Sequence, residues 1–389
     1  MGQTIVVHAA LACFAAISLI VLLRNTARRM GLVDHPGGRK QHEGAVPVVG
    51  GLAIFGAFAF STLLITQAEP LYPFRSLLGG MGLLVLAGVL DDMHDLSAVA
   101  KLALQCAAAL LMASWGGVYV ADLGDLFGLG GSLALGNFAI PFTLVCVLGI
   151  INGINMTDGI DGLAGGLTLV SLLAFAALFA ELRLPSHLLI ASILIGSVVG
   201  FLCFNLRHPL RSQANVFLGD AGSMALGFAL CWFAVTLTRV PATTRVAPIA
   251  IVWLIAVPLL DMGVVILRRV LAGKSPLAAD REHLHHLLLR AGFSYAATTW
   301  ALLLAAVICA GVGLAIWKYG VRDAWGFYGF IGLLVGTLVF TRVVKNLQSG
   351  NPSRQDTEEA ASVPGTGASV DDGGVVLLRE VEVREIRKR

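Results

Sequence analysis

Amide and acidic side chains gather in a glycine-rich stretch between two long apolar runs, residues 152–166 (NGINMTDGIDGLAGG). Such groups are costly in a hydrocarbon core unless they are paired, and glycine disfavours a regular helix interior. A helix cap from Asp158 or Asp161 is the simplest role for this stretch, but a cap needs only one side chain. We therefore expect the stretch to leave the bilayer and to build a site that includes Asn155.

Acidic residues also end one apolar run and begin another. Asp91 and Asp92 are adjacent in LDDMHDL (90–96), at the C-terminal end of an expected helix. Neighbouring carboxylates there need a cation or a proton, because the helix dipole also disfavours negative charge. Asp220, in VFLGDAGS (216–223), either caps the next helix or binds a metal. Metal recruitment or proton abstraction from an acidic substrate would use the Asp91–Asp92 pair.

Cationic and imidazole side chains lie in two other polar segments. Lys40 stands in RKQHEG (39–44), and DREHLHH (280–286) supplies Arg281, His283, His285 and His286. A positive-inside loop and an amphipathic interfacial helix are the ordinary alternatives. The histidine spacing differs from the usual zinc pair, and no cysteine assists. Together with the acids, these groups predict magnesium-assisted handling of a diphosphate at one membrane face.

The elements that hold these groups are membrane helices. The chain has 389 residues, of which 57% are hydrophobic and 13% charged, about half the charged fraction of a soluble domain. Apolar runs of about 20 residues span a bilayer. They predict an all-α polytopic membrane protein with 10–11 transmembrane helices, a short external β-hairpin at 115–137 and active-site loops at the cytoplasmic face. The expected helices are 5–23, 48–66, 76–90, 98–114, 138–151, 163–180, 187–204, 221–237, 247–267, 298–317 and 324–341.

Charge sets the expected orientation. Lysine and arginine are more frequent in the loops that hold most of the acids, so these loops should be cytoplasmic, with the N-terminus outside and the C-terminus inside. The first apolar run lacks a basic n-region and is expected to be a retained helix. We divide the chain into a transmembrane domain, 1–345, and a cytoplasmic tail, 346–389, that is polar and largely disordered.

Four motifs in order resemble the polyprenyl-phosphate N-acetylhexosamine-1-phosphate transferases, of the glycosyltransferase family 4 type. They are LDDMHDL, NGINMTDGIDGLAGG, VFLGDAGS and SPLAADREHLHHLL, and the resemblance covers roughly residues 30–295. It implies magnesium-dependent (or manganese-dependent) transfer of a sugar phosphate from a UDP-amino-sugar to undecaprenyl or decaprenyl phosphate, releasing UMP. This is a first membrane step of cell-envelope glycan synthesis. The DREHLHH form is similar to the branch that uses UDP-N-acetylglucosamine.

The resemblance also implies roles for single residues. Asp220 matches the magnesium-binding aspartate, Asn155 a position near the metal, and Phe217 the aromatic residue that stacks on uracil. Asn205 matches a nucleoside-contacting asparagine, although its spacing to Asp220 is longer than in the peptidoglycan branch. The remaining matches are the two aspartate pairs expected to be catalytic: Asp91, Asp92, Asp158 and Asp161. The acceptor phosphate is mostly dianionic at pH 7, so Asp91 or Asp92 is either a base or a group that binds a proton or an ion.

Other functions and partners follow from the same reasoning. The peptidoglycan transferase that uses a MurNAc-pentapeptide donor is the nearest alternative. An ion-coupled transporter is the rival from another class, but its ionisable groups usually lie near the midplane, within inverted repeats. The sequence contains no HExxH motif, which an intramembrane metalloprotease would need. We expect an inner-membrane location, contact with membrane lipid, no nucleic acid partner and a possible homodimer.

Overall fold

The computed structural model describes residues 2–34, 45–65, 71–207, 211, 213–240, 246–275 and 283–349, and two short strands at 369–370 and 376–377. Two residues of the predicted site, Lys40 and Arg281, lie outside these ranges. The chain forms two compact units, Met1–Val339 and Phe340–Arg389. In the second unit, β3 (Ser369–Val370) pairs antiparallel with β4 (Val376–Leu377). Most of the predicted tail falls outside the described residues.

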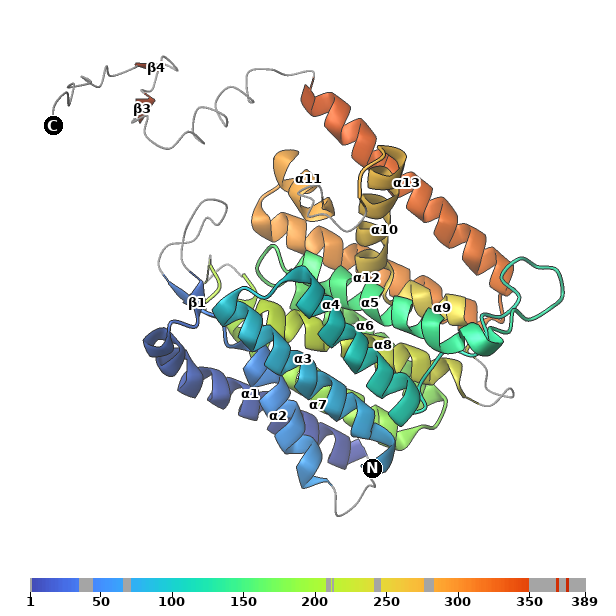
Figure 1. Ribbon diagram of the computed structural model, residues 1–389, viewed down its shortest axis with the longest axis horizontal. Helices are drawn as coiled ribbons and strands as arrows, with labels where there is room; N and C mark the ends of the chain where they lie inside the picture. The colour runs from blue at the N-terminus through green and yellow to red at the C-terminus, as the bar shows by residue number, and fades with distance from the viewer. Residues whose placement is uncertain are drawn as a thin grey trace. The chain divides into compact units, whose positions relative to one another are not determined.

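Helices make up most of the first unit (Figure 1). Nine helices of the described chain are long and apolar enough to cross a membrane, or ten if the bent pair α9–α10 is one span. The all-α polytopic membrane fold is therefore confirmed. In chain order the helices are α1 (Gly2–Met30), α2 (Gly50–Leu64), α3 (Arg75–His94), α4 (Ala98–Leu110), α5 (Ala139–Thr157), α6 (Leu163–Glu181), α7 (Pro185–Asn205), α8 (Gly219–Thr238), α9 (Pro248–Leu254), α10 (Ala256–Leu271), α11 (Leu284–Arg290), α12 (Tyr295–Lys318) and α13 (Asp323–Ser349).

Helix α8 lies at the centre of the bundle, where α2, α3, α5 and α6 pack around it. Its large side chains, among them Trp232 and Phe228, are fully buried. Two crossings at its first turn depend on glycine, because a methyl group on Gly51 or Gly88 would overlap the backbone of α8 at Gly222 or Ala221. These close crossings bring the start of α8 against α2 and the end of α3.

Helix α5 is longer than the sequence predicted. The expected helix ended at residue 151, but α5 continues to Thr157, so Asn152 and Asn155 are helical rather than in a loop. The reason is that these partly buried amides find hydrogen-bond partners within the bundle. Asn152 donates to Leu148 O at 2.8 Å and to Gln105 Oε1, on α4, at 2.9 Å. A polar group that is satisfied in place need not leave the bundle.

The expected continuous helix 247–267 is broken instead. Helices α9 and α10 meet at an angle of 91°. Pro258 explains the break, because its ring would clash with the carbonyl of Leu254, four residues earlier, in a continuous helix. The carbonyl freed at the break accepts a hydrogen bond from Ser171 Oγ at 2.8 Å.

The expected β-hairpin at 115–137 is also different. In this stretch the described residues form one antiparallel bridge, between Asp122 and Ala134, without flanking strands. Positive φ angles at Gly117, Gly124 and Gly128 interrupt the ladder that strands would need. A two-residue ladder instead joins β1 (Val33–Asp34) to β2 (Val46–Pro47), before α2.

Candidate active site

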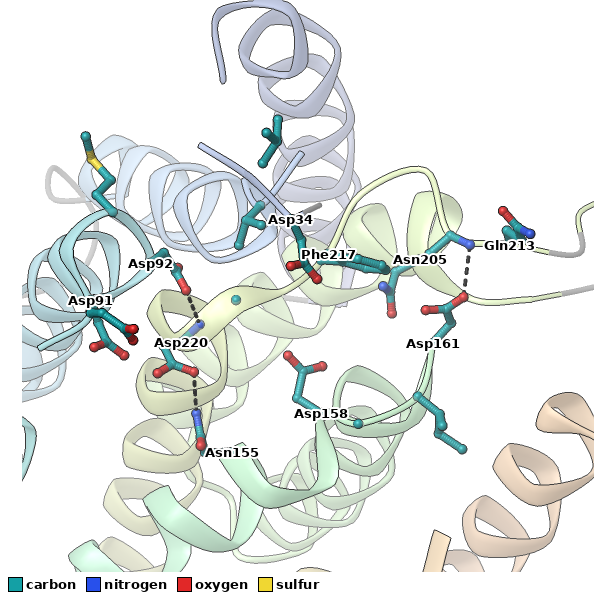
Figure 2. A pocket seen from close by; sticks show the side chains of 18 of the residues that line it. Asp34, Asp91, Asp92, Asn155, Asp158, Asp161, Asn205, Gln213, Phe217 and Asp220 are labelled. Carbon is teal, nitrogen blue, oxygen red and sulfur yellow. Dashed lines mark hydrogen bonds between the residues drawn. The ribbon is translucent and has the colours of Figure 1, made fainter. Parts of the chain in front are cut away.

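One cavity of about 950 Å³ opens at the end of the bundle where α3, α5 and α7 end and α4, α8 and α12 begin (Figure 2). It brings together most of the residues that the sequence singled out. Those that line it are Asp91, Asp92, Asn155, Asp158, Asp161, Asn205, Phe217, Asp220 and His286. His283 and His285 lie behind this lining.

Lys101 joins two of the acidic residues at one end of the cavity. Its ammonium group forms an ion pair with Asp91 Oδ2 and a second one, at 3.2 Å, with Asp220 Oδ2. The carboxylate of Asp91 also accepts a hydrogen bond from Leu96 N at 2.8 Å. Lys101 therefore supplies the cation that the crowded acids at the end of α3 require.

Two further residues, Asn155 and Asp92, hold Asp220. Asn155 Nδ2 donates to Asp220 Oδ1 and to Ser223 Oγ, both at 2.8 Å. The amide of Asp220 donates to Asp92 Oδ1 at 3.1 Å. Asp220 is thus in the first turn of α8 and is not its cap, since the cap residue is Leu218. Asp92 Oδ2 is buried and has no hydrogen-bond partner among the described residues.

A second group of contacts forms at the other end of the cavity. Arg207 donates to Asp161 Oδ2 at 2.7 Å, and Ala214 N donates to the same oxygen at 3.0 Å. The guanidinium of Arg207 also lies 4.6 Å from the centre of the Tyr295 ring. The structure therefore places Asp161 in an anchor for the loop between α7 and α8, while its catalytic role stays a prediction. Figure 2 shows Asp158 between Asp220 and Asp161.

Asn205 links two loops of the site. It is buried, accepts a hydrogen bond from Gly162 N at 2.8 Å and donates to Val216 O at 2.9 Å. The backbone of Phe217 is fixed next to this link, because Phe217 N donates to Pro47 O at 2.9 Å and Gly50 N donates to Phe217 O at 3.0 Å. Backbone bonds thus hold Phe217 at the cavity wall and leave its ring to line the cavity.

The histidines lie on and just before the short helix α11. The rings of His285 and His286 are 4.2 Å apart, and His283 stacks on His285 at 5.8 Å. Burial, and then the neighbouring His286, lower the pKa of His285 to about 3; burial also lowers the pKa of His286. The lowered pKa values favour the neutral form of both imidazoles in this structure. Their part in substrate binding stays a prediction.

A magnesium ion is compatible with this donor set. Across the described residues, no group of three or more His, Cys, Asp or Glu side chains could hold a metal alone. Magnesium usually takes one or two carboxylates and completes its shell with phosphate and water. Asp220 and the buried, unpartnered oxygen of Asp92 are two such carboxylates. Asn155 donates to Asp220, so this geometry gives it an orienting part; direct ligation by Asn155 stays a prediction.

The sequence reasoning missed three residues of this region. Lys101 is a single cation in the first turn of an apolar helix, ten residues after Asp91, and that isolation is the signal. Arg207 follows Leu206, the cap residue at the end of α7. Asp261 is a lone acid inside the apolar run 247–267, and it is buried against His283.

Comparison with known proteins gives one consistent answer. Residues 74–238 match the family model described as glycosyl transferase family 4. An undecaprenyl-phosphate α-N-acetylglucosaminyl 1-phosphate transferase of Yersinia pestis is 37% identical over 299 residues, which cover 77% of this chain and 80% of that protein. Proteins with the same description from Escherichia coli K12 and Haemophilus influenzae are 36% and 34% identical, over 75% and 80% of this chain and 78% and 86% of theirs.

Proposed function

The chain belongs to glycosyl transferase family 4, and we propose that it transfers N-acetylglucosamine 1-phosphate from UDP-N-acetylglucosamine to undecaprenyl phosphate or a related polyprenyl phosphate. The observation that carries the proposal is the juxtaposition of Lys101, Asp91, Asp92 and Asp220 at one end of a single cavity. Phosphoryl transfer needs this kind of charge compensation and positioning, and little covalent chemistry from the protein.

The reaction exchanges one phosphoanhydride bond for another. An oxygen of the acceptor phosphate forms a bond to the phosphorus that carries the sugar, and the bond from that phosphorus to the UMP oxygen breaks. The acceptor is a phosphate monoester with a second pKa of about 6, so it is mostly dianionic at pH 7. UMP is an acidic leaving group and needs no proton from the enzyme. We therefore favour attack without an obligatory base.

Several residues of the site orient the groups that would contact the substrate. Asn155 and Lys101 fix the two oxygens of Asp220, and Asp92 holds the backbone amide of Asp220 in the first turn of α8. Lys101 is 31% exposed, so its ammonium can also turn toward a donor phosphate that enters the cavity. The contacts of Asp91 with Lys101 and Leu96 suit a structural carboxylate better than a free base.

We further propose Mg²⁺ as the cofactor, with Mn²⁺ as a substitute. Asp220 and Asp92 would hold it, and Asn155 would orient Asp220. When bound, the ion would offset the charge of the donor diphosphate. Lys101 currently bridges Asp91 and Asp220, which supports a demand for positive charge at this position.

Orientation and location are also proposals. The excess of lysine and arginine supports a cytoplasmic site in the inner membrane, with the N-terminus outside and the C-terminus inside. Reporter fusions after Lys318 and after Ser349 would test this, because the first should report the outer side and the second the inner side. Contact of the acceptor with membrane lipid and a homodimer are further predictions.

The decisive experiment is a donor panel. Purified protein would be incubated with Mg²⁺, undecaprenyl phosphate and radiolabelled UDP-N-acetylglucosamine, UDP-N-acetylgalactosamine or UDP-MurNAc-pentapeptide, and the lipid-linked product measured. We expect product from UDP-N-acetylglucosamine and its loss with EDTA. Faster turnover of the MurNAc-pentapeptide donor would replace the proposal with the peptidoglycan reaction. Undiminished turnover in EDTA would contradict the proposed Mg²⁺ cofactor.

A further inference from the structure

Asp261 is a buried acid outside the cavity. It is 3% exposed and lies on α10, six residues after the break between α9 and α10. A carboxylate is costly at such a place unless its partners are fixed. Both of its oxygens have partners in the segment that carries the histidines. Oδ2 lies 3.0 Å from His283 Nδ1, and Oδ1 accepts a hydrogen bond from Leu284 N at 2.7 Å.

These two contacts fix the start of helix α11. Its cap residue, His283, makes no side-chain cap of its own. The carboxylate of Asp261, on α10, caps α11 in its place. It accepts a hydrogen bond from the first amide of α11 and also holds the ring of the cap residue. A short helix whose first amide is satisfied from outside depends on that outside group for its orientation.

Helix α11 in turn supports the turn after α5. His285 is 2% exposed, and a methyl group on Gly159 would overlap its Nε2. Gly159 follows Asp158 directly, and His286, the next residue of α11, lines the cavity. Helix α10 itself packs on α5, where Pro258 lies next to Gly153. The contacts therefore form a closed path from α5 through α10, Asp261 and α11 back to Gly159.

We propose that Asp261 is a positioning residue, which holds the histidine helix so that His285 supports the Asp158–Gly159 turn and His286 faces the cavity. A second consequence concerns the proton on His283. An ionised carboxylate only accepts hydrogen bonds, so a neutral His283 must carry its proton on Nδ1. The kinetic part of this inference rests on the proposed function; the tautomer of His283 does not.

Two substitutions separate the functions of Asp261. In Asp261→Asn the amide oxygen must stay with Leu284 N, so the amide nitrogen faces His283 and forces its proton onto Nε2. Helix α11 then stays tethered with the wrong tautomer. Asp261→Leu removes both contacts. Ser171→Ala is the matched control, because it removes the buried hydrogen bond at the nearby α9–α10 break without touching α11.

The expected results combine spectroscopy and kinetics. With ¹⁵N-histidine labelling, we expect the Nδ1-protonated form of His283 in the wild type and the Nε2-protonated form in Asp261→Asn. His283→Asn identifies the signal by its loss. We expect Asp261→Leu to lower kcat at least tenfold at saturating substrates, and Asp261→Asn to lower it less, while Ser171→Ala lowers only the melting temperature.

A double-mutant cycle completes the test. If Asp261 acts through His285, the effects of Asp261→Leu and His285→Ala on kcat should not add, because the second change removes a support that the first has already displaced. Additive effects would overturn the proposed path, as would an Asp261→Leu variant with full kcat. An Nε2-protonated His283 in the wild type would overturn the tautomer. If wild-type protein had no transferase activity, the spectra would still decide the contact between Asp261 and His283.

Discussion

Asp220 shows how much a single oxygen matters at this site. One of its oxygens accepts from Asn155 and the other pairs with Lys101. In Asp220→Asn the oxygen can stay with Asn155, but the new amide then turns its hydrogens toward the ammonium of Lys101. We expect Asp220→Asn to lose several kcal/mol of transition-state stabilisation, so that turnover falls steeply while the protein stays folded. The measurement is kcat/KM at saturating magnesium, with melting temperature as the check on folding.

The control for Asp220→Asn is a carboxylate outside the cavity. Asp122 accepts hydrogen bonds from Gly124 N and Ser132, in the loop between α4 and α5. Asp122→Asn should keep the wild-type rate. If Asp220→Asn retained more than about a tenth of wild-type activity, a loss of only roughly 1.4 kcal/mol, Asp220 would not be a metal ligand.

Phe217 offers a change that affects binding more than chemistry. Its backbone is held by Pro47 and Gly50, so Phe217→Ala should leave the local fold in place. Stacking on a base contributes roughly 1–3 kcal/mol, and a uracil ring is remote from the reacting phosphorus. We expect Phe217→Ala to raise KM for the UDP-sugar more than it lowers kcat. Phe217→Leu, which keeps apolar volume without a flat ring, should resemble the alanine variant, and Phe217→Tyr should resemble the wild type. Unchanged KM with a lower melting temperature would show that the Phe217 ring stabilises the fold and does not bind the nucleotide.

At this scale the sequence predicts residue types better than their partners. Asp91, Asp92, Asp158 and Asp220 were singled out because acids are costly beside apolar runs, and all four line the cavity. Lys101 and Asp261 were missed for a physical reason. Lys101 is the one charged residue of α4 and Asp261 is the one acid of α10, and the role of each depends on a partner more than twenty residues away along the chain. Only the packing of the helices supplies that partner.

At the scale of the helices, a partly buried hydrogen bond between Asn152 and Gln105 joins α5 to α4. Gln105 lies one turn after Lys101, and Asn152 one turn before Asn155; Asn152 donates to Gln105 at 2.9 Å. Gln105→Leu should therefore shift both active-site residues slightly. We expect a loss of about 1 kcal/mol in stability, typical of such bonds between membrane helices, and a fall in kcat smaller than that of Asp220→Asn. Unfolding in detergent and steady-state kinetics would measure the two effects.

The comparison for Gln105→Leu is a double-mutant cycle with Asn152→Leu. Because the two side chains share one bond, the second change should cost little once the first has been made. Equal and additive losses would mean that the bond does not hold the two helices in register. Gly311→Ala, on α12 where a methyl group meets open space, is a suitable neutral control.

Element boundaries were predictable where composition alone decides them. The expected helices 163–180 and 221–237 match α6 and α8 within two residues at each end. The predicted end of α5 was wrong because Asn152 and Asn155 stay within the helix and donate hydrogen bonds to Gln105 and Asp220. The break between α9 and α10 was missed, although Pro258 carried the signal.

For the whole molecule, antiparallel alternation of the helices explains why distant motifs meet. The C-terminal ends of α3, α5 and α7 and the N-terminal ends of α4, α8 and α12 share one end of the bundle. The motifs that hold Asp91, Asn155 and Asp220 lie at such ends, and the described part of the histidine motif lies at the start of α11, shortly before α12. The sequence therefore predicted the location of the site through simple helix counting. It could not predict which acids pair with Lys101 or Arg207, because these contacts depend on the rotation of each helix.

The stability of the whole molecule should also depend on pH through the histidine helix. Burial, and then His286, lower the pKa of His285 from 6.5 to about 3, so the folded protein leaves it neutral where the unfolded chain would bind a proton. Between those two values the unfolded state holds more protons at His285, so the contribution of His285 to stability falls as pH decreases. The expected loss approaches roughly 1.4 kcal/mol per pH unit below about pH 6.

Unfolding would be measured at pH 7.5, 6.5 and 5.5 for the wild type, His285→Phe and His8→Gln, in which the replaced residue lies near the start of α1. His285→Phe should flatten the dependence, although it lowers stability at pH 7.5, and His8→Gln should keep it; an equally steep fall in His285→Phe would assign the acid sensitivity to another group.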